Sequence, residues 1–227
     1  MKYPPRQASP PRLVSAPVLR AKPDRPAKRG RPIGDREAKS GELIAAARYV
    51  IAREGYVGAS LRKVAARAGC STGAVTYYFA NKEVMVATVV EALFDEFDGW
   101  LVDQASPNDI RAIFDRMILW TASGKGDAWL VAFQLLVRAA SDPPLAAVFQ
   151  KRYAQFRRKL ARLLENGQGQ GVIRGDIPAD LLADQVCAMG DGWSMMFPVE
   201  PQRFRHGRIQ DLVNAAMTML TPQATQR

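Results

Sequence analysis

The stretch that most restricts the fold of this chain is residues 60–82, SLRKVAARAGCSTGAVTYYFANK. In a pattern counted from residue 61, Ala65, Gly69 and Val75 occupy the fifth, ninth and fifteenth positions. A small residue lets a second helix cross close by, glycine accepts the positive φ of a sharp turn, and valine fills the angle between the helices. The stretch therefore predicts two short helices joined as a helix-turn-helix.

Residues that can cap helices stand at the predicted starts of three helices. Ser60 precedes the first helix of the motif, Ser71 precedes the second, and Asn81 precedes the helix that follows. At this position a serine or asparagine side chain accepts a hydrogen bond from a backbone N–H of the first turn. An ordinary helical hairpin joined by Gly69 is the alternative, but three caps at matching spacing favour the helix-turn-helix.

Residues 42–90 resemble the TetR family of bacterial transcriptional regulators. The turn of the family's motif is matched by Ala68, Gly69, Cys70 and Ser71, and its end by Tyr77, Tyr78, Phe79 and Lys82. Many members carry a tyrosine where this chain has Thr76, so the contacts of that tyrosine do not carry over. The resemblance implies a dimeric DNA-binding regulator, expected to be a repressor, that binds a palindromic operator and is released by a small-molecule effector.

The hydrophobic pattern beyond the motif is helical, and no alternating strand pattern competes with it. We therefore expect an all-α protein made of a disordered basic arm, a helix-turn-helix DNA-binding domain, and a larger ligand-binding and dimerisation domain, in residues 1–34, 35–82 and 83–227. Helices outside the motif are expected in residues 35–53, 82–104, 109–122, 127–140, 144–167, 178–197 and 203–220. Gly55 is expected to end the first of them, with Tyr56 and Val57 in the core.

Basic residues are concentrated in the first third of the chain. The formal net charge is +10, and residues 1–34 alone hold nine Lys or Arg against one acid. Residues 35–82 carry a net charge of +4, while residues 83–227 carry −2. This distribution predicts that one end of the chain binds a polyanion, double-stranded DNA, and that the other end has a different role.

The proposed arm has a sequence that suits the minor groove of DNA. It holds eight of the fifteen prolines, and residues 28–32, KRGRP, resemble an AT-hook core. Arg29 and Arg31 would reach along the floor of an A·T-rich groove, where the negative potential is concentrated. The alternative is a basic tail that binds phosphates without preference. An arm that dominated binding would make the protein an architectural A·T-rich DNA-binding protein, which is the alternative function.

Residues of the motif divide into those that position the protein on DNA and those that read bases. Phosphate contacts are expected from the backbone amides at the start of the recognition helix, and from Ser60, Arg62, Ser71, Tyr77, Tyr78 and Lys82. Base contacts are expected from Thr72, Gly73, Ala74 and Thr76, whose short side chains let the helix enter the major groove. Because no Arg, Asn or Gln lies in this helix, specificity is expected to depend also on DNA shape, water and the arm.

Large aromatic and methionine side chains are frequent in the larger domain. The candidate ligand-binding residues are Phe97, Phe114, Met117, Trp129, Phe133, Met189 and Trp193. Such side chains can line a cavity for a small organic ligand, and methionine adapts to its outline. The alternative is that each of them simply fills the core. The ligand-binding interpretation depends on the domain plan of the resembled family.

The last two predicted helices carry the features expected of a dimer interface. Ala183, Cys187 and Gly190 are small and stand three or four residues apart, so another helix could approach closely. The resemblance implies a four-helix interface between two copies, and dimers of this kind hold two recognition helices about 34 Å apart, in successive major grooves. Residues 191–193 are loosely similar to the choline-responsive betaine regulators of the family, and this likeness identifies no ligand.

No arrangement of residues predicts an enzyme, a cofactor or a metal site. The single histidine, His206, lies in an Arg-rich run, and the two cysteines suggest neither a disulfide framework nor a metal site. Asp95, Glu96 and Asp98 are expected to fan out over a helix surface and to favour solubility. Residues 167–171, GQGQG, lack the residues of a phosphate-binding loop and are expected to form a flexible connection. No apolar run suits a membrane span or a secretory signal, so we expect a cytoplasmic protein.

Overall fold

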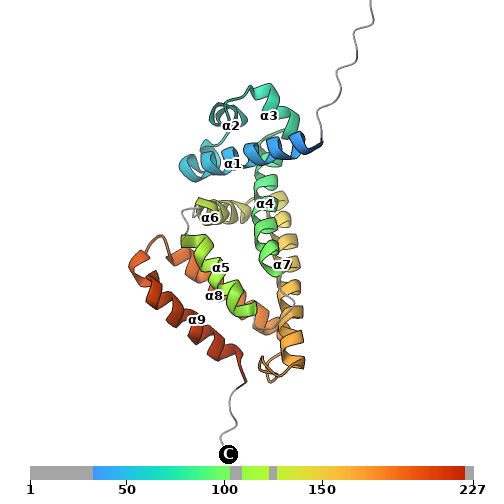
Figure 1. The fold of residues 1–227 in the computed structure, drawn as a ribbon. Helices are drawn as coiled ribbons and strands as arrows, with labels where there is room; N and C mark the ends of the chain where they lie inside the picture. The colour runs from blue at the N-terminus through green and yellow to red at the C-terminus, as the bar shows by residue number, and fades with distance from the viewer. Residues whose placement is uncertain (1–32, 103–108, 123–126, 223–227) are drawn as a thin grey trace, which may run out of the picture.

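The computed structural model of the protein describes residues 33–102, 109–122 and 127–222. All regular structure in these ranges is helical, which confirms the predicted all-α fold (Figure 1). The elements are α1 (Ile33–Gly58), α2 (Leu61–Arg67), α3 (Thr72–Tyr78), α4 (Lys82–Val102), α5 (Asp109–Ala122), α6 (Asp127–Ala139), α7 (Pro143–Gly169), α8 (Ala179–Met196), the 3₁₀ turn η1 (Pro201–Phe204) and α9 (His206–Leu220). In the same ranges no helix combines the length and the apolar character needed to cross a lipid bilayer.

The predicted DNA-binding domain consists of α1, α2 and α3 around a small apolar core. Leu43 of α1, Val64 of α2 and Val75 of α3 are each fully buried, and Ala65 is 2% exposed. Helix α2 contacts both α1 and α3, so each helix of the motif is held against a neighbour. The inner side of α3 is therefore packed against the other helices, and its outer side is exposed to solvent.

Helix α1 bends sharply at Gly55, where φ is 71° and ψ is 173°. This left-handed conformation suits glycine, as the sequence predicts. After the bend, Tyr56 packs against the core, but the Val57 side chain is 89% exposed. The prediction that Val57 joins the core was therefore wrong. The bend turns its side chain outward, while its carbonyl oxygen accepts a hydrogen bond of 3.1 Å from Lys82 Nζ.

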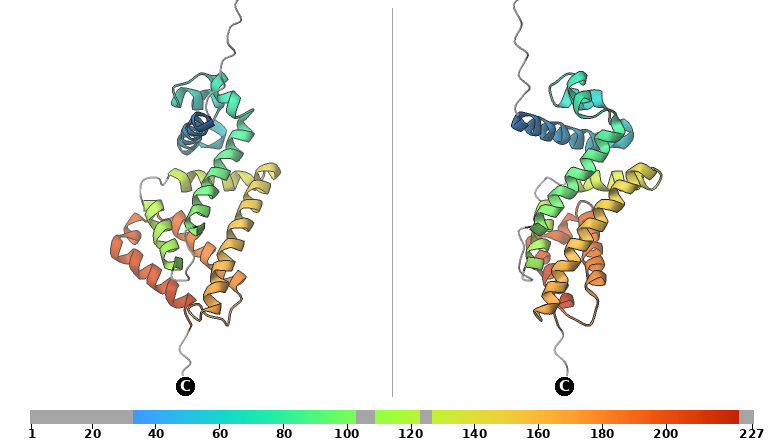
Figure 2. Two further views of the ribbon diagram at one scale, coloured as in Figure 1. Left: turned by 45° about the vertical axis from the view of Figure 1, so that its right-hand side comes forward. Right: turned by 90° about the vertical axis from the view of Figure 1, so that its right-hand side faces the viewer.

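Helix α4 passes from the DNA-binding domain into the larger domain (Figure 2). It contacts α1, α5, α6 and α7. Helix α6 also contacts α1 directly. The two domains are therefore joined by one continuous helix and by a second helix that packs across the boundary.

The buried apolar residues form two cores. The upper core comprises the buried residues of α1–α4 and α6, with Leu145 and Phe149 of α7. The lower core comprises the buried residues of α5, α8 and α9, with Leu160, Leu163 and Leu164 of α7. The upper core is shared by the DNA-binding domain and the top of the larger domain, so these parts are one packed unit.

The connection between α7 and α8 is a hydrogen-bonded turn in place of the flexible link that was expected. The Gln168 side-chain amide donates hydrogen bonds of 2.8 and 2.7 Å to the carbonyl oxygens of Arg174 and Ile177. Gly171 takes a positive φ of 72°, and Ile173 is 2% exposed within the lower core. These contacts fix the position at which α8 starts.

Candidate DNA interface and ligand cavity

The turn of the helix-turn-helix has the geometry that the sequence predicts. Ser60 Oγ accepts a hydrogen bond of 3.3 Å from Lys63 N at the start of α2. Ser71 Oγ accepts one of 3.1 Å from Ala74 N at the start of α3. Between these caps, Gly69 has a φ of 63°. The two helices therefore meet at an angle set by local backbone chemistry.

The recognition helix α3 is anchored on one side and open on the other. Val75 is its buried anchor. Its outer surface consists of the exposed residues Thr72, Gly73, Thr76 and Tyr77, with Ala74 half-buried. The Thr76 hydroxyl donates a hydrogen bond of 3.1 Å to the carbonyl oxygen of Gly73, and its oxygen can still accept one from a base.

Two tyrosines mark the end of α3. Tyr77 is 69% exposed, and Tyr78 is half-buried, with ring centroids 5.3 Å apart in an edge-on arrangement. The guanidinium carbon of Arg36, at the start of α1, lies 5.7 Å from the centroid of the Tyr77 ring. Arg36 is therefore a further cation beside the recognition helix. The sequence analysis did not single it out, although it belongs to the basic segment at residues 35–82.

Lys82 lies at the junction of α4 and the DNA-binding domain. It was expected to contact phosphate, but in the structure it is half-buried, and its ammonium bonds to the carbonyl oxygen of Val57. The same ammonium lies 4.4 Å from the centroid of the Tyr56 ring. The guanidinium of Arg138, near the end of α6, lies 4.9 Å from that centroid. Tyr56 thus contacts one cation from α4 and one from α6.

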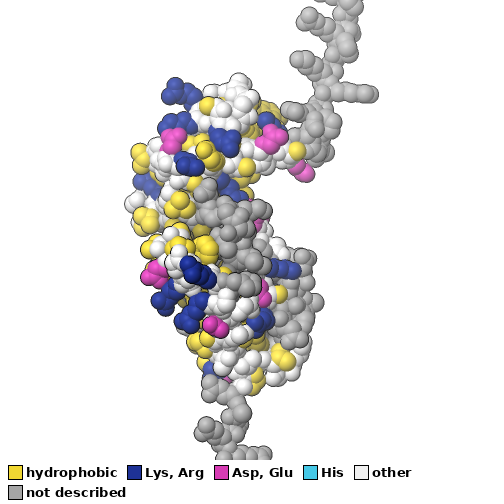
Figure 3. All heavy atoms as spheres, turned by 60° about the vertical axis from the view of Figure 1, so that its left-hand side comes forward, with side chains coloured by type: hydrophobic (Ala, Val, Ile, Leu, Met, Phe, Trp, Pro, Cys, Tyr) yellow, Lys and Arg dark blue, Asp and Glu magenta, His cyan; other side chains and the backbone are white. Residues whose placement is uncertain are grey.

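Basic side chains are also found on the rest of the DNA-binding domain. Arg62 is exposed on α2, where it is available to a phosphate. Arg53 and Arg67 lie 5.6 and 4.3 Å from the ring centroid of Tyr49. On the face in Figure 3, Lys and Arg side chains occur on both domains, with hydrophobic side chains exposed between them. Basic charge on the described surface is therefore not confined to the DNA-binding domain.

A cavity lies where the two cores meet. Its walls come from α4–α8 and consist of Phe94, Phe97, Ile113, Phe114, Met117, Trp129, Tyr153, Phe156, Leu160, Val186, Cys187, Gly190 and Asp191. The space between the wall atoms is about 520 Å³, and this volume includes open solvent. The part of it that the centre of a water-sized sphere can reach is only about 50 Å³. A small group fits without rearrangement, and a larger ligand requires wall side chains to move.

Only part of the predicted ligand-binding set reaches this cavity. Phe97, Phe114, Met117 and Trp129 lie in its wall. Phe133 stacks behind Trp129, with ring centroids 5.6 Å apart. Trp193 packs on Phe114 at 5.5 Å, and Met189 packs against the lower core. These last three residues support the wall without being part of it.

The polar end of the cavity is formed by Asp191 of α8 and Tyr153 of α7. The Tyr153 hydroxyl donates to the Asp191 carboxylate and lies 3.3 Å from each of its oxygens. Burial raises the pKa of the Asp191 carboxyl to about 6, although the Tyr153 hydrogen bond and the Arg157 charge act in the opposite direction. Burial also raises the pKa of the Cys187 thiol to about 12 and raises the pKa of the Tyr153 phenol. At neutral pH the carboxylate is therefore the charged group of the cavity.

The acidic residues of α4 bind neighbouring helices, which corrects the expectation that they only favour solubility. Arg152 of α7 lies 3.2 Å from Glu91, 2.6 Å from Asp95 and 3.3 Å from Asp98. Glu96 forms an ion pair with Arg48 of α1. Helix α4 is thus attached by charge to both domains.

Comparison with known families agrees with this arrangement. Residues 43–89 match the family described as "Bacterial regulatory proteins, tetR family". Residues 108–222, about half of the chain, match the family described as "BetI-type transcriptional repressor, C-terminal". The chain belongs to the TetR family. It is therefore a helix-turn-helix transcriptional regulator, as the motif at residues 60–82 predicted.

Individual TetR-family proteins are similar over most of their length. The HTH-type transcriptional repressor SCO4008 of Streptomyces coelicolor is 29% identical over 164 residues, which are 72% of this chain and 82% of that protein. The nicotine-responsive repressor HdnoR of Paenarthrobacter nicotinovorans is 28% identical over 179 residues, 77% of this chain and 91% of that one. A crystal structure of a transcriptional regulator from Rhodococcus sp. Rha1 is 28% identical, with a TM-score of 0.65, and covers 79% of this chain and 94% of that one.

Asp191 and Tyr153 are among the residues of this TetR-family cavity that were not predicted from the sequence, and they form its polar end. A signal was present, because each polar residue interrupts an apolar helical stripe. Asp191 follows Val186 and Cys187 on α8, and Tyr153 lies between Phe149 and Phe156 on α7. Residues in such stripes face a core, so a carboxylate there is either buried or adjacent to a cavity.

In the described part of the chain, no group of three or more His, Cys, Asp or Glu is placed to hold a metal ion.

Proposed function

We propose that this TetR-family regulator is a dimeric repressor that binds a palindromic operator and releases it when a small-molecule effector fills the cavity. The observation that carries the proposal is the course of α4. Its first residue, Lys82, contacts the DNA-binding domain through Val57 and Tyr56. Three turns later, Phe94 and Phe97 of the same helix form part of the cavity wall. A ligand that moves these rings therefore moves the support of the recognition helix.

Helix α6 supplies a second connection along the same route. Trp129, near its start, lies in the cavity wall and stacks on Phe97, with ring centroids 5.2 Å apart. Arg138, near its end, contacts the ring of Tyr56 in the DNA-binding domain. A ligand against Trp129 can thus act on the position of α1 as well as on that of α4. Typical coupling free energies of about 1–3 kcal/mol correspond to operator affinities changed about 5- to 150-fold.

The effector is expected to be a small organic molecule with an apolar body. The cavity wall is almost wholly aromatic and aliphatic, with the polar groups at one end. One similar repressor is described as nicotine-responsive, which is compatible with a small organic ligand of this kind. An effector can shift the equilibrium only if it binds the DNA-free arrangement more tightly than the DNA-bound one.

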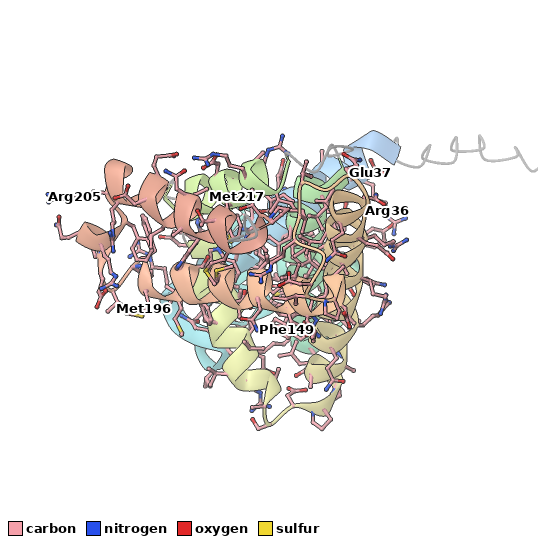
Figure 4. The ribbon with its side chains drawn as sticks, turned by 90° about the horizontal axis from the view of Figure 1, so that it is seen from below. Arg36, Glu37, Phe149, Met196, Arg205 and Met217 are labelled. Atoms are coloured by element: carbon pink, nitrogen blue, oxygen red, sulfur yellow. The ribbon has the colours of Figure 1, made fainter. Side chains whose placement is uncertain are left out.

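The proposed dimer uses the outer faces of α8 and α9. Leu181 and Met195 of α8 are 52% and 51% exposed, and Met219 of α9 is 56% exposed. By contrast, the small residues Ala183 and Gly190 are buried within the chain, and Gly190 lies against Met117 of α5. Seen from below, Met196 and Arg205, at the ends of α8 and η1, lie at one edge of the domain (Figure 4). The large exposed side chains are the ones proposed to meet a second copy.

The proposed DNA contacts follow from exposure. Thr72, Thr76 and Ala74 are proposed to meet base edges, with Gly73 allowing close approach of the backbone. Phosphate contacts are proposed for the exposed residues Arg62 and Tyr77, for the partly exposed Ser60 and Tyr78, for Ser71 beside the first amides of α3, and for Arg36. Lys82 is proposed to anchor α4, because its ammonium already bonds to a carbonyl oxygen. Arg29 and Arg31 lie outside the described residues, and their minor-groove role stays a prediction.

The test is selection of bound fragments from randomised and genomic DNA by the full-length protein at about 150 mM salt. A matched selection uses the Arg29→Ala, Arg31→Ala double variant. The proposal predicts one enriched palindrome that both proteins select. Enrichment of A·T-rich DNA without dyad symmetry, lost in the double variant, would contradict it and would favour the architectural function.

A further inference from the structure

The polar end of the cavity restricts the chemistry of the ligand more than its apolar walls do. Among the wall residues, only Asp191 carries a formal charge at neutral pH, and the remaining polar side-chain groups are the Tyr153 hydroxyl, the Cys187 thiol and the Trp129 indole N–H. The wall segments of α4, α5 and α6 contribute aromatic, aliphatic and methionine side chains only. A ligand in this space therefore meets one anion surrounded by apolar groups.

The hydrogen-bonding capacity of Asp191 is only partly used within the described structure. A carboxylate offers about four lone-pair sites. Here it accepts from a single hydroxyl, that of Tyr153, at the long distance of 3.3 Å to each oxygen. The nearest cation, Arg157, lies outside the cavity wall, where it pairs with Asp184 at 3.4 Å and covers the Tyr153 ring at 5.9 Å. Asp191 can therefore accept further hydrogen bonds from a ligand.

The surrounding walls favour a cation. Phe94 contacts Tyr153 with ring centroids 4.9 Å apart, and Phe97 stacks on Trp129 at 5.2 Å. Faces of aromatic rings attract cations. An anionic ligand would be repelled by the carboxylate, and a neutral ligand would leave the charge of the buried carboxylate uncompensated.

We propose that the effector is a protonated amine with an apolar body, and that its N–H groups donate to the Asp191 carboxylate while its body lies between Phe97 and Phe114. This inference rests on the proposed function and names the class of ligand for it. An amine with N–H groups is preferred over a quaternary ammonium ion because the carboxylate needs donors, and a quaternary nitrogen has none. The space of about 50 Å³ that is open to a water-sized sphere is large enough for an ammonium group.

Amine binding should depend on pH through Asp191. The titratable and charged groups around it are Tyr153 and Arg157 of α7, and Cys187 and Asp184 of α8. Tyr153 and Cys187 stay neutral over the physiological range, because burial raises both pKa values. Since only the ionised carboxylate pairs with the ammonium group, affinity should rise as the pH increases from 5 to 7.5.

The test is isothermal titration of the full-length protein with a series of amines from benzylamine to 4-phenylbutylamine. The corresponding phenylalkyl alcohols serve as neutral partners of the same shape, and benzyltrimethylammonium serves as the cation without N–H. At least one amine should bind about tenfold or more tightly than its alcohol, as expected for a charged hydrogen bond. Asp191→Asn should abolish this preference, whereas Tyr153→Phe, which leaves the carboxylate in place, should retain it.

Equal affinities for amines and alcohols, tighter binding of benzyltrimethylammonium than of benzylamine, or the absence of any amine binding would overturn the inference. So would an amine preference that survives Asp191→Asn. Operator binding is measured separately in the absence of ligand, because it tests the proposed function alone. A palindrome bound by a protein that ignores amines would overturn only the ligand class. Amine binding that depends on Asp191 but leaves the operator bound would overturn the effector step of the proposed function.

Discussion

Replacing Asp191 with asparagine should stabilise the ligand-free protein at neutral pH. Burial raises the pKa of this carboxyl from 3.8 to about 6. Each unit of pKa corresponds to about 1.4 kcal/mol, so the charged form lowers the free energy of unfolding by about 3 kcal/mol. Asparagine removes the charge and keeps an oxygen that can accept from the Tyr153 hydroxyl. The proposed ligand contact at Asp191 therefore comes at the expense of stability.

The direction of the pH dependence follows from which state holds the proton. Between about pH 3.8 and pH 6, the folded protein keeps the Asp191 proton that the unfolded chain has released. The contribution of the Asp191 proton to stability is therefore fully present below about pH 3.8, and it is lost as the pH rises to about 6 and above. The Asp191→Asn variant lacks this loss, so its advantage over the unsubstituted protein should grow by about 2 kcal/mol from pH 4.5 to pH 7.5.

The assay is urea unfolding followed by circular dichroism at several pH values between 4.5 and 7.5. Protein concentration is held fixed, because dimerisation would make the midpoint depend on it. Asp184→Asn is the matched control, since Asp184 lies on the same helix with a side chain 58% exposed. It should change the free energy of unfolding by less than about 0.5 kcal/mol.

Only the change with pH tests the argument. The side-chain N–H of asparagine can leave a buried donor without an acceptor, which adds a cost that is the same at every pH. A difference between the variant and the unsubstituted protein that stays constant from pH 4.5 to 7.5 would therefore refute the reasoning, whatever its sign. It would mean that burial does not disfavour the charge of Asp191.

Four further substitutions test the turn, the cavity, the helix junction and the phosphate contacts. Gly69→Ala should lower the free energy of unfolding by about 1 kcal/mol in urea titrations, because φ is 63° there while the added methyl group meets open space. Gly190→Ala would bring a Cβ to 2.6 Å from Met117 Sδ, so Met117 should move into the cavity, and titration should detect weaker amine binding with operator binding kept. Lys82→Ala should leave the salt dependence of operator binding unchanged, whereas Arg62→Ala should lower its slope by about one. If both variants lowered the salt slope of operator binding equally, Lys82 would be a phosphate contact, as first predicted.

The helix-turn-helix could be predicted residue by residue because its rules are local. Ser60 and Ser71 cap helices through hydrogen bonds to amides three residues away, and Gly69 supplies a positive φ. No distant part of the chain is needed for these features. The helices of the larger domain were equally accessible, since apolar spacing and breakers such as Pro143 and Gly171 depend only on neighbouring residues.

Contacts between distant segments could not be predicted in this way. The acids of α4 were expected to face solvent, but Arg152, more than fifty residues later in the chain, pairs with Asp95 and Asp98. Spacing places a residue on one side of a helix and does not reveal which helix lies opposite. Val57 was misplaced for a related reason, because the backbone direction after Gly55 decides which of two adjacent side chains is buried.

The cavity shows the same limit at the candidate site. Four of the residues selected for their aromatic or methionine side chains lie in the cavity wall, but Phe133 and Trp193 lie one layer behind it. Type and spacing do not distinguish a wall residue from the residue that supports it. The sequence indicated the polar end of the cavity only indirectly, through a carboxylate in an otherwise apolar stripe of α8. Its partner Tyr153 comes from α7 and becomes evident only when the two helices pack.

The position of the cavity is compatible with the proposed movement of α4, because the helix stays attached to the rest of the protein on both sides of the cavity. Its walls come from both cores, so a ligand changes the fit of the upper core on the lower one. Arg152 faces Glu91, Asp95 and Asp98, which follow one another at intervals of one helical turn along α4. Glu91 and Asp95 are 38% and 70% exposed, and exposed pairs of this kind contribute about 1 kcal/mol or less each. Arg152 and Asp98 are only 13% and 16% exposed, so that pair costs more to break. If α4 shifts along its axis, as the proposed release of DNA requires, acids one helical turn apart allow Arg152 to keep a carboxylate partner, although Asp98 is also held by Lys159 at 2.8 Å.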